Sequence, residues 1–574
     1  MPVGKEVGSP PNDAPLLYNE YRPFVKTGLA WEKPPMGWMK IKLLAIFKAL
    51  VGLGLLTSLI VTACSRVVSP PDSVPALPSV SSEEQVEATS EQVHRFCGYC
   101  HAYPPPDTFP RSAWRFETLQ GYRFFDRLLL DKPSLEIPVE VPPRESVVRY
   151  YEKRAPEELP LLPQGKAIRS LPVHFEWQVH QYPSPHFWTP AVSNLNLVHL
   201  SDDKKLDLLV CDMRSGDILA FKPYEKTPSW RVLGRVSHPA HVEVVDLDGD
   251  GIKDLLVADL GSFSPTNEKV GRVVWLRGRP DGTYTPITLL KGVGRVADVQ
   301  AADFRGTGRL DLIVGVFGWK DTGEILFLEN QTTDWSKPVY VPRVLDDRHG
   351  TIHVPVCDLN KDGRPDFVAL ISQEHETIVA FLNQGDGKFR KEIIYTAPHP
   401  AYGSSGIQVV DLNGDGNLDI LYTNGDILDD PFLLKPYHGV QWLENKGTFP
   451  FEHHPLAAMY GAMRAVAADF TGKGKLDIVA AAFLPESRFP QRQKMHLDSL
   501  IYLEQVEPGK YVPHTLESIT CDHVTCVAGD WNGDGKVHFA TGDLLMEDDN
   551  PNASSIALWK NLGIEAASPL RTKN

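Results

Sequence analysis

The stretch VEVVDLDGDGIKDLLVADL, residues 242–260, decides how this chain folds. It begins as an apolar run, passes through an Asp-rich loop that contains two glycines, and ends as a second apolar run. Short apolar runs bounded by turn residues are typical of buried β-strands. The stretch therefore predicts a strand, a tight acidic loop and a second strand.

The same pattern recurs with a period of about 50 residues. Near-complete acidic loops occur in CDLNKDGRPDFVAL from residue 357, VDLNGDGNLDILY from residue 410 and GDWNGDGKVHFAT from residue 529; poorer copies occur in HLSDDKKLDLLV from residue 199, ADFRGTGRLDLIV from residue 302 and ADFTGKGKLDIVA from residue 468. The residues at loop position 1 are His199, Asp246, Asp303, Asp358, Asp411, Asp469 and Asp530. A further apolar strand, such as VVWLRG or ILFLEN, follows each unit. Seven units predict a mainly-β fold, a seven-bladed β-propeller.

Four of these loops have the composition of calcium sites. Alternate side chains in a tight turn converge on one point, and Ca²⁺ takes six to eight oxygen ligands. An EF-hand shares positions 1, 3 and 5 but needs flanking helices and a Glu at position 12, which these loops lack. In the last loop His538 replaces the carboxylate at position 9. The expected Ca²⁺ ligands are Asp246, Asp248, Asp250, Asp254, Asp358, Asn360, Asp362, Asp366, Asp411, Asn413, Asp415, Asp419, Asp530, Asn532 and Asp534.

On these residues the chain resembles FG-GAP/VCBS-repeat proteins, a family known from integrin-type propellers and bacterial surface proteins. The resemblance covers about residues 190–565 and rests on the repeated D-x-[DN]-x-D-G loop between strands. It implies Ca²⁺ in the loop after the innermost strand of each calcium-binding blade, on one face of the disc. A solvated turn that merely tolerates Asp is the alternative for any single loop.

A second motif precedes the repeats. Cys97-Gly98-Tyr99-Cys100-His101 has the C-x-x-C-H spacing at which two thiols bind the haem vinyl groups and the His ligates the iron. The helical pattern of residues 81–96 leads into it, and further helices are expected over residues 111–130 and 144–156. The motif predicts a small α-helical cytochrome c-like domain with covalent haem c. A zinc site and a simple disulfide are the alternatives.

The sequence does not assign the second axial ligand of the expected haem. No Met occurs between His101 and Met213, so the usual second ligand is missing from this segment. The candidates are a propeller His, water, or one of Tyr99, Tyr122 and Lys132, whereas His94 is poorly placed because it shares a helix with the motif.

The N-terminus resembles an export signal. Residues 43–63 are largely apolar, follow Lys40 and Lys42, and end in V-T-A-C at Cys64, as in a bacterial lipoprotein signal whose Cys becomes lipidated. An uncleaved transmembrane helix is the alternative. The expected organisation is a non-structured or mis-started segment at 1–38, a signal or anchor at 39–64, a linker at 65–84, the haem domain at 85–165 and the propeller at 166–574.

The face opposite the acidic loops is a candidate ligand face. Counting five residues back from position 1 reaches the start of each innermost strand near the axis, and long loops between second and third strands share this face. The candidate residues are His241, Asp298, His353, His375, His438 and Arg464. A hydrated channel mouth without a ligand is the alternative. Cys521 and Cys526 bracket a short loop on this face and could form a disulfide.

The net charge of −15 argues against nucleic acid as a partner. The sequence contains no nucleophile elbow, phosphate loop or H-E-x-x-H motif, so it assigns no catalytic residue. We expect an extracytoplasmic, membrane-anchored protein of a bacterial cell envelope, in the periplasm or at the cell surface, that serves in electron transfer to a redox partner or in partner binding. An oxidoreductase with its substrate on the propeller face, and an adhesive propeller without haem, are the alternatives.

Overall fold

The structure is a computed structural model, and it describes residues 86–131, 139–162, 171–183, 189–200, 204–428, 431–546 and 555–564. The expected non-structured or mis-started segment at 1–38, the predicted signal or anchor at 39–64 with its predicted lipidation site Cys64, the linker at 65–84 and Lys132 lie outside these residues. None of the described helices is both long enough and apolar enough to span a bilayer.

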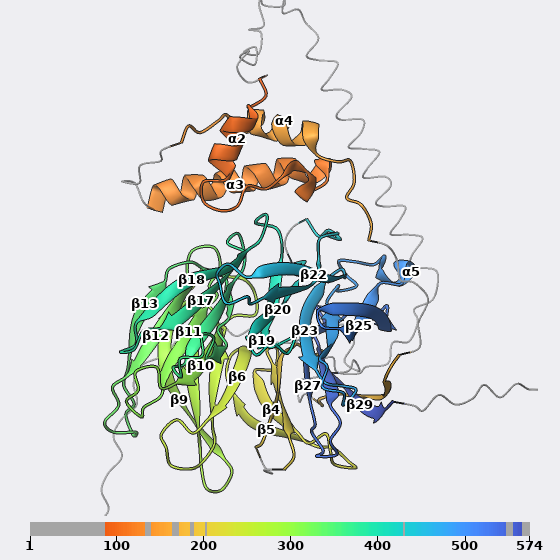
Figure 1. The fold of residues 1–574 in the computed structure, drawn as a ribbon. Coiled ribbons are helices and arrows are strands. Elements are labelled where there is room, and N and C mark those ends of the chain that lie inside the picture. The colour runs from red at the N-terminus through yellow and green to blue at the C-terminus, as the bar shows by residue number, and fades with distance from the viewer. Residues whose placement is uncertain are drawn as a thin grey trace, which may run out of the picture. The chain divides into compact units, whose positions relative to one another are not determined.

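Most of the described chain forms seven antiparallel sheets, the blades of a β-propeller (Figure 1). The first three blades are β2 (Val192–Val198), β3 (Asp207–Asp212), β4 (Asp217–Phe221) and β5 (Trp230–Arg235); β6 (Pro239–Val245), β7 (Asp254–Asp259), β8 (Gly271–Gly278) and β9 (Tyr284–Val293); and β10 (Val296–Ala302), β11 (Asp311–Val316), β12 (Glu324–Asn330) and β13 (Tyr340–Asp346). The predicted seven-bladed fold is confirmed.

The remaining blades repeat this order. They are β14 (Thr351–His353), β15 (Val356–Cys357), β16 (Asp366–Ile371), β17 (Thr377–Asn383) and β18 (Phe389–Thr396); β19 (Ser404–Val410), β20 (Asp419–Asn424), β21 (Gly439–Glu444) and β22 (Glu452–Ala458); β23 (Ala462–Ala468), β24 (Asp477–Ala482), β25 (Asp498–Glu507) and β26 (Lys510–Ser518); and β27 (His523–Gly529), β28 (His538–Asp543) and β29 (Ile556–Gly563), completed by β1 (His174–His180). A short helix, α5 (Arg492–Met495), precedes β25.

Two features of the blades go beyond the sequence pattern. The outer strand of blade seven is β1, which comes from before blade one and pairs antiparallel with β29, so the two ends of the propeller are joined in one sheet. In blade four the innermost strand is split into β14 and β15, and Pro355 lies in the gap, where it has no N–H to donate to the sheet.

The core follows from the apolar runs of the second strands. All six residues of each second strand are buried, because neighbouring blades cover both faces of these strands. Residues of adjacent blades share hydrophobic clusters, such as the one that joins Leu256 and Val273 of blade two to Leu312 and Leu326 of blade three. The fourth strands are largely exposed, as β5 and β18 illustrate.

Among the described residues before the propeller there are three α-helices, α2 (Ser90–Cys97), α3 (Arg111–Asp131) and α4 (Arg144–Arg154), and a short 3₁₀ turn, η2 (Pro106–Thr108). Thr89 caps α2 and forms a capping box with Gln92, so the helix begins at Ser90. The expected helix over 81–96 is therefore too long at its start: residues 87–89 are not helical, and residues 81–85 lie outside the described chain. Helices α3 and α4 match the predicted ones.

Candidate functional site

The acidic loops connect each first strand to its second strand. In blade two the carboxylate of Asp246 accepts hydrogen bonds from the backbone N–H groups of Asp250 (3.1 Å) and Gly251 (2.9 Å). The loops that begin at Asp358, Asp411 and Asp530 make the same bonds. These bonds form the turn, and in blade two they bring oxygens of Asp246, Asp248 and Asp250 within 4.8 Å of one another.

The position-9 carboxylates fasten the loop to the sheet. Asp254 accepts from the N–H groups of Leu247 (3.0 Å) and Gly278 (2.6 Å), and Asp366 accepts from those of Leu359 (3.0 Å) and Asn383 (2.7 Å). Both carboxylates are almost fully buried, and burial raises their pKa despite these hydrogen bonds. Position 9 thus has a structural function in these two blades, whether or not a cation binds.

Position 3 of blade two differs from its neighbours. The Asp248 side chain is 1% exposed, and neither of its carboxylate oxygens has a hydrogen-bond partner. Its contact is an ion pair with Arg277, whose Nη2 lies 2.5 Å from Oδ2. A buried carboxylate without hydrogen bonds, in a loop of converging oxygens, fits the coordination that Ca²⁺ requires.

In blade seven a histidine replaces the position-9 carboxylate. His538 Nδ1 accepts a hydrogen bond from the N–H of Asn561 (2.9 Å), which leaves the proton of the neutral ring on Nε2. That Nε2 lies 3.1 Å from Oδ1 of Asn532 at position 3. His538 therefore performs the structural function of position 9 and also engages a predicted calcium ligand.

The predicted polar ring on the propeller axis is partly assembled. Asp298 Oδ1 lies 3.5 Å from His241 Nε2, Asp298 Oδ2 lies 4.0 Å from His353 Nδ1, and Arg464 Nη1 lies 3.1 Å from His353 Nε2. Burial and the Arg464 charge lower the pKa of His353 well below its usual value. Burial opposes a charge on His241, but the nearby Asp298 and Glu243 outweigh it and raise its pKa. Four of the candidate face residues are thus brought together from four blades.

The other two candidates lie in the loops between second and third strands, where the sequence places them, rather than in this axial group. His438 is 1% exposed, so it lies in the interior rather than on a surface that could meet a ligand. His375, in the β16–β17 loop, lies beside Glu374 and His349. His349 was not among the residues predicted from the sequence. It lies in the loop between the outer strand of blade three and the innermost strand of blade four, and that position just before an innermost strand was the one signal that it lies on the candidate ligand face.

The C-x-x-C-H motif lies at the end of α2. Cys97 is the last residue of the helix, Cys100 and His101 follow in a turn, and both thiols are free. Burial raises the pKa of Cys97 to about 11. His101 Nδ1 lies 2.8 Å from the carbonyl oxygen of Ala102, which can only accept, so Nδ1 carries the proton and Nε2 is a lone-pair donor.

One residue beside the motif has a polar atom without a partner. Tyr151, which packs in the same hydrophobic cluster as Cys97, has a buried hydroxyl with no hydrogen-bond partner. Among the suggested second axial ligands, Tyr122 is buried and donates to the carbonyl of Pro142 (2.7 Å), whereas Tyr99 is exposed. Met213 packs in a cluster of propeller residues that includes Phe483.

The helical segment contacts propeller loops on the face opposite the acidic loops. Arg127 Nη2 lies 2.8 Å from Asp321 Oδ2 in the β11–β12 loop, and Lys320 lies over the ring of Phe124 at 4.3 Å. Ala401 and Leu433, from loops of blades four and five, pack against its hydrophobic cluster. The Glu374 charge also raises the pKa of Cys100, after burial, so the motif lies close to the β16–β17 loop.

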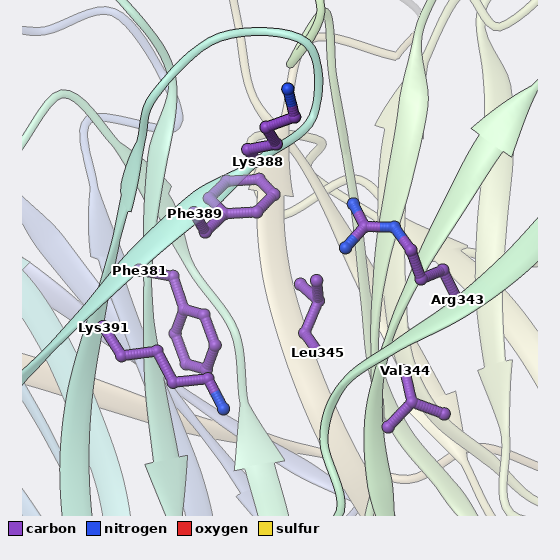
Figure 2. A pocket seen from close by; sticks show the side chains of 7 residues that line it. All are labelled: Arg343, Val344, Leu345, Phe381, Lys388, Phe389 and Lys391. Atoms are coloured by element: carbon purple, nitrogen blue, oxygen red, sulfur yellow. The ribbon is translucent and has the colours of Figure 1, made fainter.

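Two further features lie outside these sites. A hollow of about 230 Å³ at the outer strands of blades three and four is lined by Arg343, Val344, Leu345, Phe381, Lys388, Phe389 and Lys391, none of them a predicted site residue (Figure 2). Cys521 and Cys526, which could form a disulfide on the sequence alone, are both free thiols in this structure. The Cys521 sulfur lies 3.6 Å from Ser499 Oγ, whereas the Cys526 sulfur faces the backbone of blade six at Arg464 (3.8 Å).

Comparison with known proteins identifies the repeat. Residues 358–422, from the acidic loop of blade four to the second strand of blade five, match the FG-GAP-like repeat family. The chain contains an FG-GAP-like repeat. A curated protein of Plasmodium yoelii yoelii, described as "T-cell immunomodulatory protein homolog", is 24% identical over 145 residues, which are 24% of this chain and 21% of that protein. The chain therefore spans about a fifth of that relative's length.

Solved structures also resemble the FG-GAP propeller at low similarity. Two crystal structures of BBS1N in complex with ARL6DN, soaked with lead and with mercury, align at a TM-score of 0.40 with 10% and 11% identity. Each covers 68% of this chain and 99% or 100% of the solved chain.

Proposed function

We propose that this protein is an extracytoplasmic electron-transfer protein in which Cys97 and Cys100 bind a haem covalently and His101 ligates its iron. The observation that carries the proposal is the state of His101. Its Nδ1 is bonded to a backbone carbonyl, and its Nε2 is left with the lone pair that an axial ligand needs. In metal-binding histidines generally, such a hydrogen bond from the non-ligating ring nitrogen fixes the orientation of the ring.

The surroundings of the motif also fit such a group. The buried Tyr151 hydroxyl, in the same hydrophobic cluster as Cys97, lacks a hydrogen-bond partner, and a haem brings carboxylates that can accept from a hydroxyl. When bound, the haem would supply one-electron redox chemistry. The chain's part is to hold the group through two thiols, to orient His101, and to surround the site with the aromatic side chains of α3 and α4.

We further propose that calcium stabilises the propeller on which the haem segment packs. The buried, hydrogen-bond-free Asp248 carboxylate supports this, as do the converging oxygens of Asp246 and Asp250. The contacts of Arg127 and Phe124 with the β11–β12 loop would then fix the haem segment to a rigid support. A redox partner would approach the same assembly at the membrane, if the predicted signal or anchor holds the protein there.

A second candidate is an oxidoreductase that passes electrons from a substrate to the haem. The axial group of His241, Asp298, His353 and Arg464 favours it, because solvent reaches parts of the two imidazoles and a guanidinium lies beside them. We prefer electron transfer without substrate turnover, because it requires no catalytic residues in addition to the haem ligands. A small-molecule electron donor that reduces the haem in wild type and not in Arg464→Ala would favour the second candidate.

The haem proposal makes a direct prediction. Full-length protein produced with haem-maturation machinery is expected to keep its haem absorbance through acid–acetone extraction, since thioether bonds survive it. Cys100→Ala should lose one thioether and shift the pyridine haemochrome band, whereas Cys357→Ser, a matched thiol removal in blade four, should leave the band unchanged. Colourless wild-type protein, or haem that is extracted, would contradict the proposal.

A further inference from the structure

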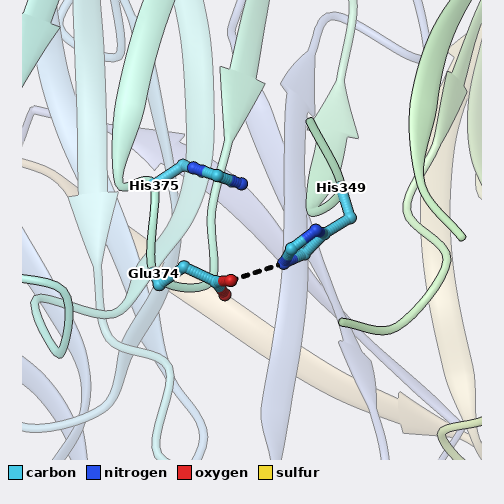
Figure 3. Close-up of side chains that lie close together, drawn as sticks. All are labelled: His349, Glu374 and His375. Atoms are coloured by element: carbon cyan, nitrogen blue, oxygen red, sulfur yellow. Dashed lines mark ion pairs between the residues drawn. The ribbon is translucent and has the colours of Figure 1, made fainter. Parts of the chain in front are cut away.

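A cluster of two imidazoles and one carboxylate lies on the propeller face that contacts the helical segment. His349 comes from the loop between β13 and β14, and Glu374 and His375 come from the loop between β16 and β17. Figure 3 shows the Glu374 carboxylate directed at the His349 ring, with the His375 ring extending over the same space. Two loops thus bring metal-ligand side chains together.

The separations between the ligand atoms are short enough for all three residues to bind one metal ion after small side-chain movements. His349 Nε2 lies 2.8 Å from Glu374 Oε1, the two imidazole centroids are 4.8 Å apart, and one ligand atom of each residue lies within 4.8 Å of the others. Tetrahedral bonds of about 2.0–2.1 Å place ligand atoms about 3.3 Å apart. No separation therefore needs to shorten by more than about 1.5 Å, which side-chain rotation can supply.

Hydrogen bonds account for only part of the cluster. Nε2 of His349 pairs with Glu374 Oε1 at 2.8 Å, whereas Nε2 of His375 is buried and has no hydrogen-bond partner. Burial lowers the pKa of His375 to about 4, more than Glu374 offsets. Burial acts against ionised Glu374, but its contact with His349 prevails and lowers its pKa to about 2. The unpaired His375 nitrogen and the Glu374 carboxylate are donors of the kinds that bind transition metals.

The ligand types select the ion. Ca²⁺ and Mg²⁺ take oxygen ligands, as in the acidic loops, whereas imidazole nitrogen favours Zn²⁺ and its neighbours in the first transition row. Two His and one Glu are also the donors of zinc sites that keep a fourth position open. The Glu374 charge reaches Cys100, so an ion held here would lie near the C-x-x-C-H motif.

We propose that His349, Glu374 and His375 form a binding site for one divalent transition-metal ion of the zinc class, with a position open to water. The site is separate from the calcium loops, and its three ligands all belong to the propeller. It would give the propeller face next to the helical segment a second metal centre. It would also fix the β16–β17 loop to the start of blade four.

The test is a zinc titration of the full-length protein. After chelator treatment and transfer into excess Ca²⁺, which fills the acidic loops, Zn²⁺ binding is measured by calorimetry and by metal analysis after gel filtration. Wild type is expected to retain one equivalent. Glu374→Gln and His375→Gln keep side-chain size but remove a ligand, and each should weaken binding by more than the 10–100-fold typical of an outer-shell change. His174→Gln, an exposed histidine on β1, is the matched control and should bind like wild type.

Two outcomes would overturn the site. One is folded wild-type protein that retains no Zn²⁺; the other is Glu374→Gln or His375→Gln protein that binds it as tightly as wild type. A Cys97→Ser/Cys100→Ser variant separates this site from the motif. Retained binding supports three propeller ligands, and lost binding would contradict them by making the thiols ligands. Circular dichroism and melting of each variant in Ca²⁺ confirm that the propeller remains folded.

Discussion

The acidic loops of blades two and three make the same turn with different residues. Asp246 in blade two accepts from two backbone N–H groups, and Asp303 in blade three does the same with Thr307 (2.9 Å) and Gly308 (2.7 Å). Positions 1 and 9 therefore belong to the fold and recur whether or not the other ligands are present. Positions 3 and 5 are where a calcium loop differs from an ordinary turn.

Position 3 shows this difference in charge. Blade two has Asp248 there, buried and without hydrogen bonds, and an arginine from another strand pairs with it. Blade three has Arg305, whose Nη2 lies 2.9 Å from Asp311 at position 9. In blade three an arginine of the loop itself neutralises the position-9 carboxylate. Blade two instead has carboxylates at positions 1, 3 and 5 and one neighbouring arginine, Arg277, so negative charge remains that an external cation can neutralise. The three predictions below separate structural from cation-binding carboxylates.

The largest expected effect is at position 9. Asp366→Ala removes the acceptor of two buried N–H groups, those of Leu359 and Asn383, and each unsatisfied group costs about 1–3 kcal/mol. Unfolding free energy should fall by about 2–6 kcal/mol, measured by chemical denaturation, and in chelator as well as in Ca²⁺. The matched control is Asp362→Ala at exposed position 5, which should cost about 1 kcal/mol or less in chelator. Equal losses in chelator would contradict a structural function for position 9.

The next effect is at position 3 and depends on calcium. Ca²⁺ at a hundredfold excess over its Kd stabilises the native state by about 2.7 kcal/mol per site. Asp248→Ala should remove that increment from blade two, so the difference in unfolding free energy between Ca²⁺ and chelator shrinks by about this amount. Asp303→Ala, at position 1 of blade three, weakens a turn but should leave the difference unchanged. A melting temperature of wild type that chelator does not alter would show that the loops are ordinary turns.

Much of this architecture could be predicted from the sequence, because each blade repeats the same apolar runs and the same loop. The closure by β1 could not, since HFEWQVH has no acidic loop beside it and pairs with a strand almost 400 residues later. The gathering of Asp298, His353 and Arg464 followed from counting back from position 1, because that count fixes a height on the propeller axis.

Other parts of the site depend on loop conformation, which no periodicity encodes. The approach of His349 to His375 arises where the loop before blade four meets the β16–β17 turn, in which Gln373 and Glu376 adopt positive φ. The buried position of His438 likewise follows from the path of the long β20–β21 loop rather than from residue type. The start of α2 was misplaced because Thr89 and Gln92, which form its cap, lie within a longer stretch of helix-forming residues.

The smallest expected effect is at position 9 of blade seven, where histidine does the structural work without a carboxylate charge. His538 accepts from Asn561 N–H through Nδ1 and meets Asn532 Oδ1 through Nε2, so a cation in this loop must displace that contact. His538→Asp restores the position-9 carboxylate, adds a negative charge and releases the Asn532 oxygen. We expect the Ca²⁺ affinity of this loop to rise about tenfold, or about 1.4 kcal/mol.

The measurement is calcium calorimetry, which should show one binding site with higher affinity in His538→Asp than in wild type. The control is Asp311→Asn in blade three, which lacks carboxylates at positions 3 and 5 and should leave the affinity of every calcium site unchanged. An unchanged calcium isotherm for His538→Asp would mean that the acidic loop of blade seven is a turn like that of blade three.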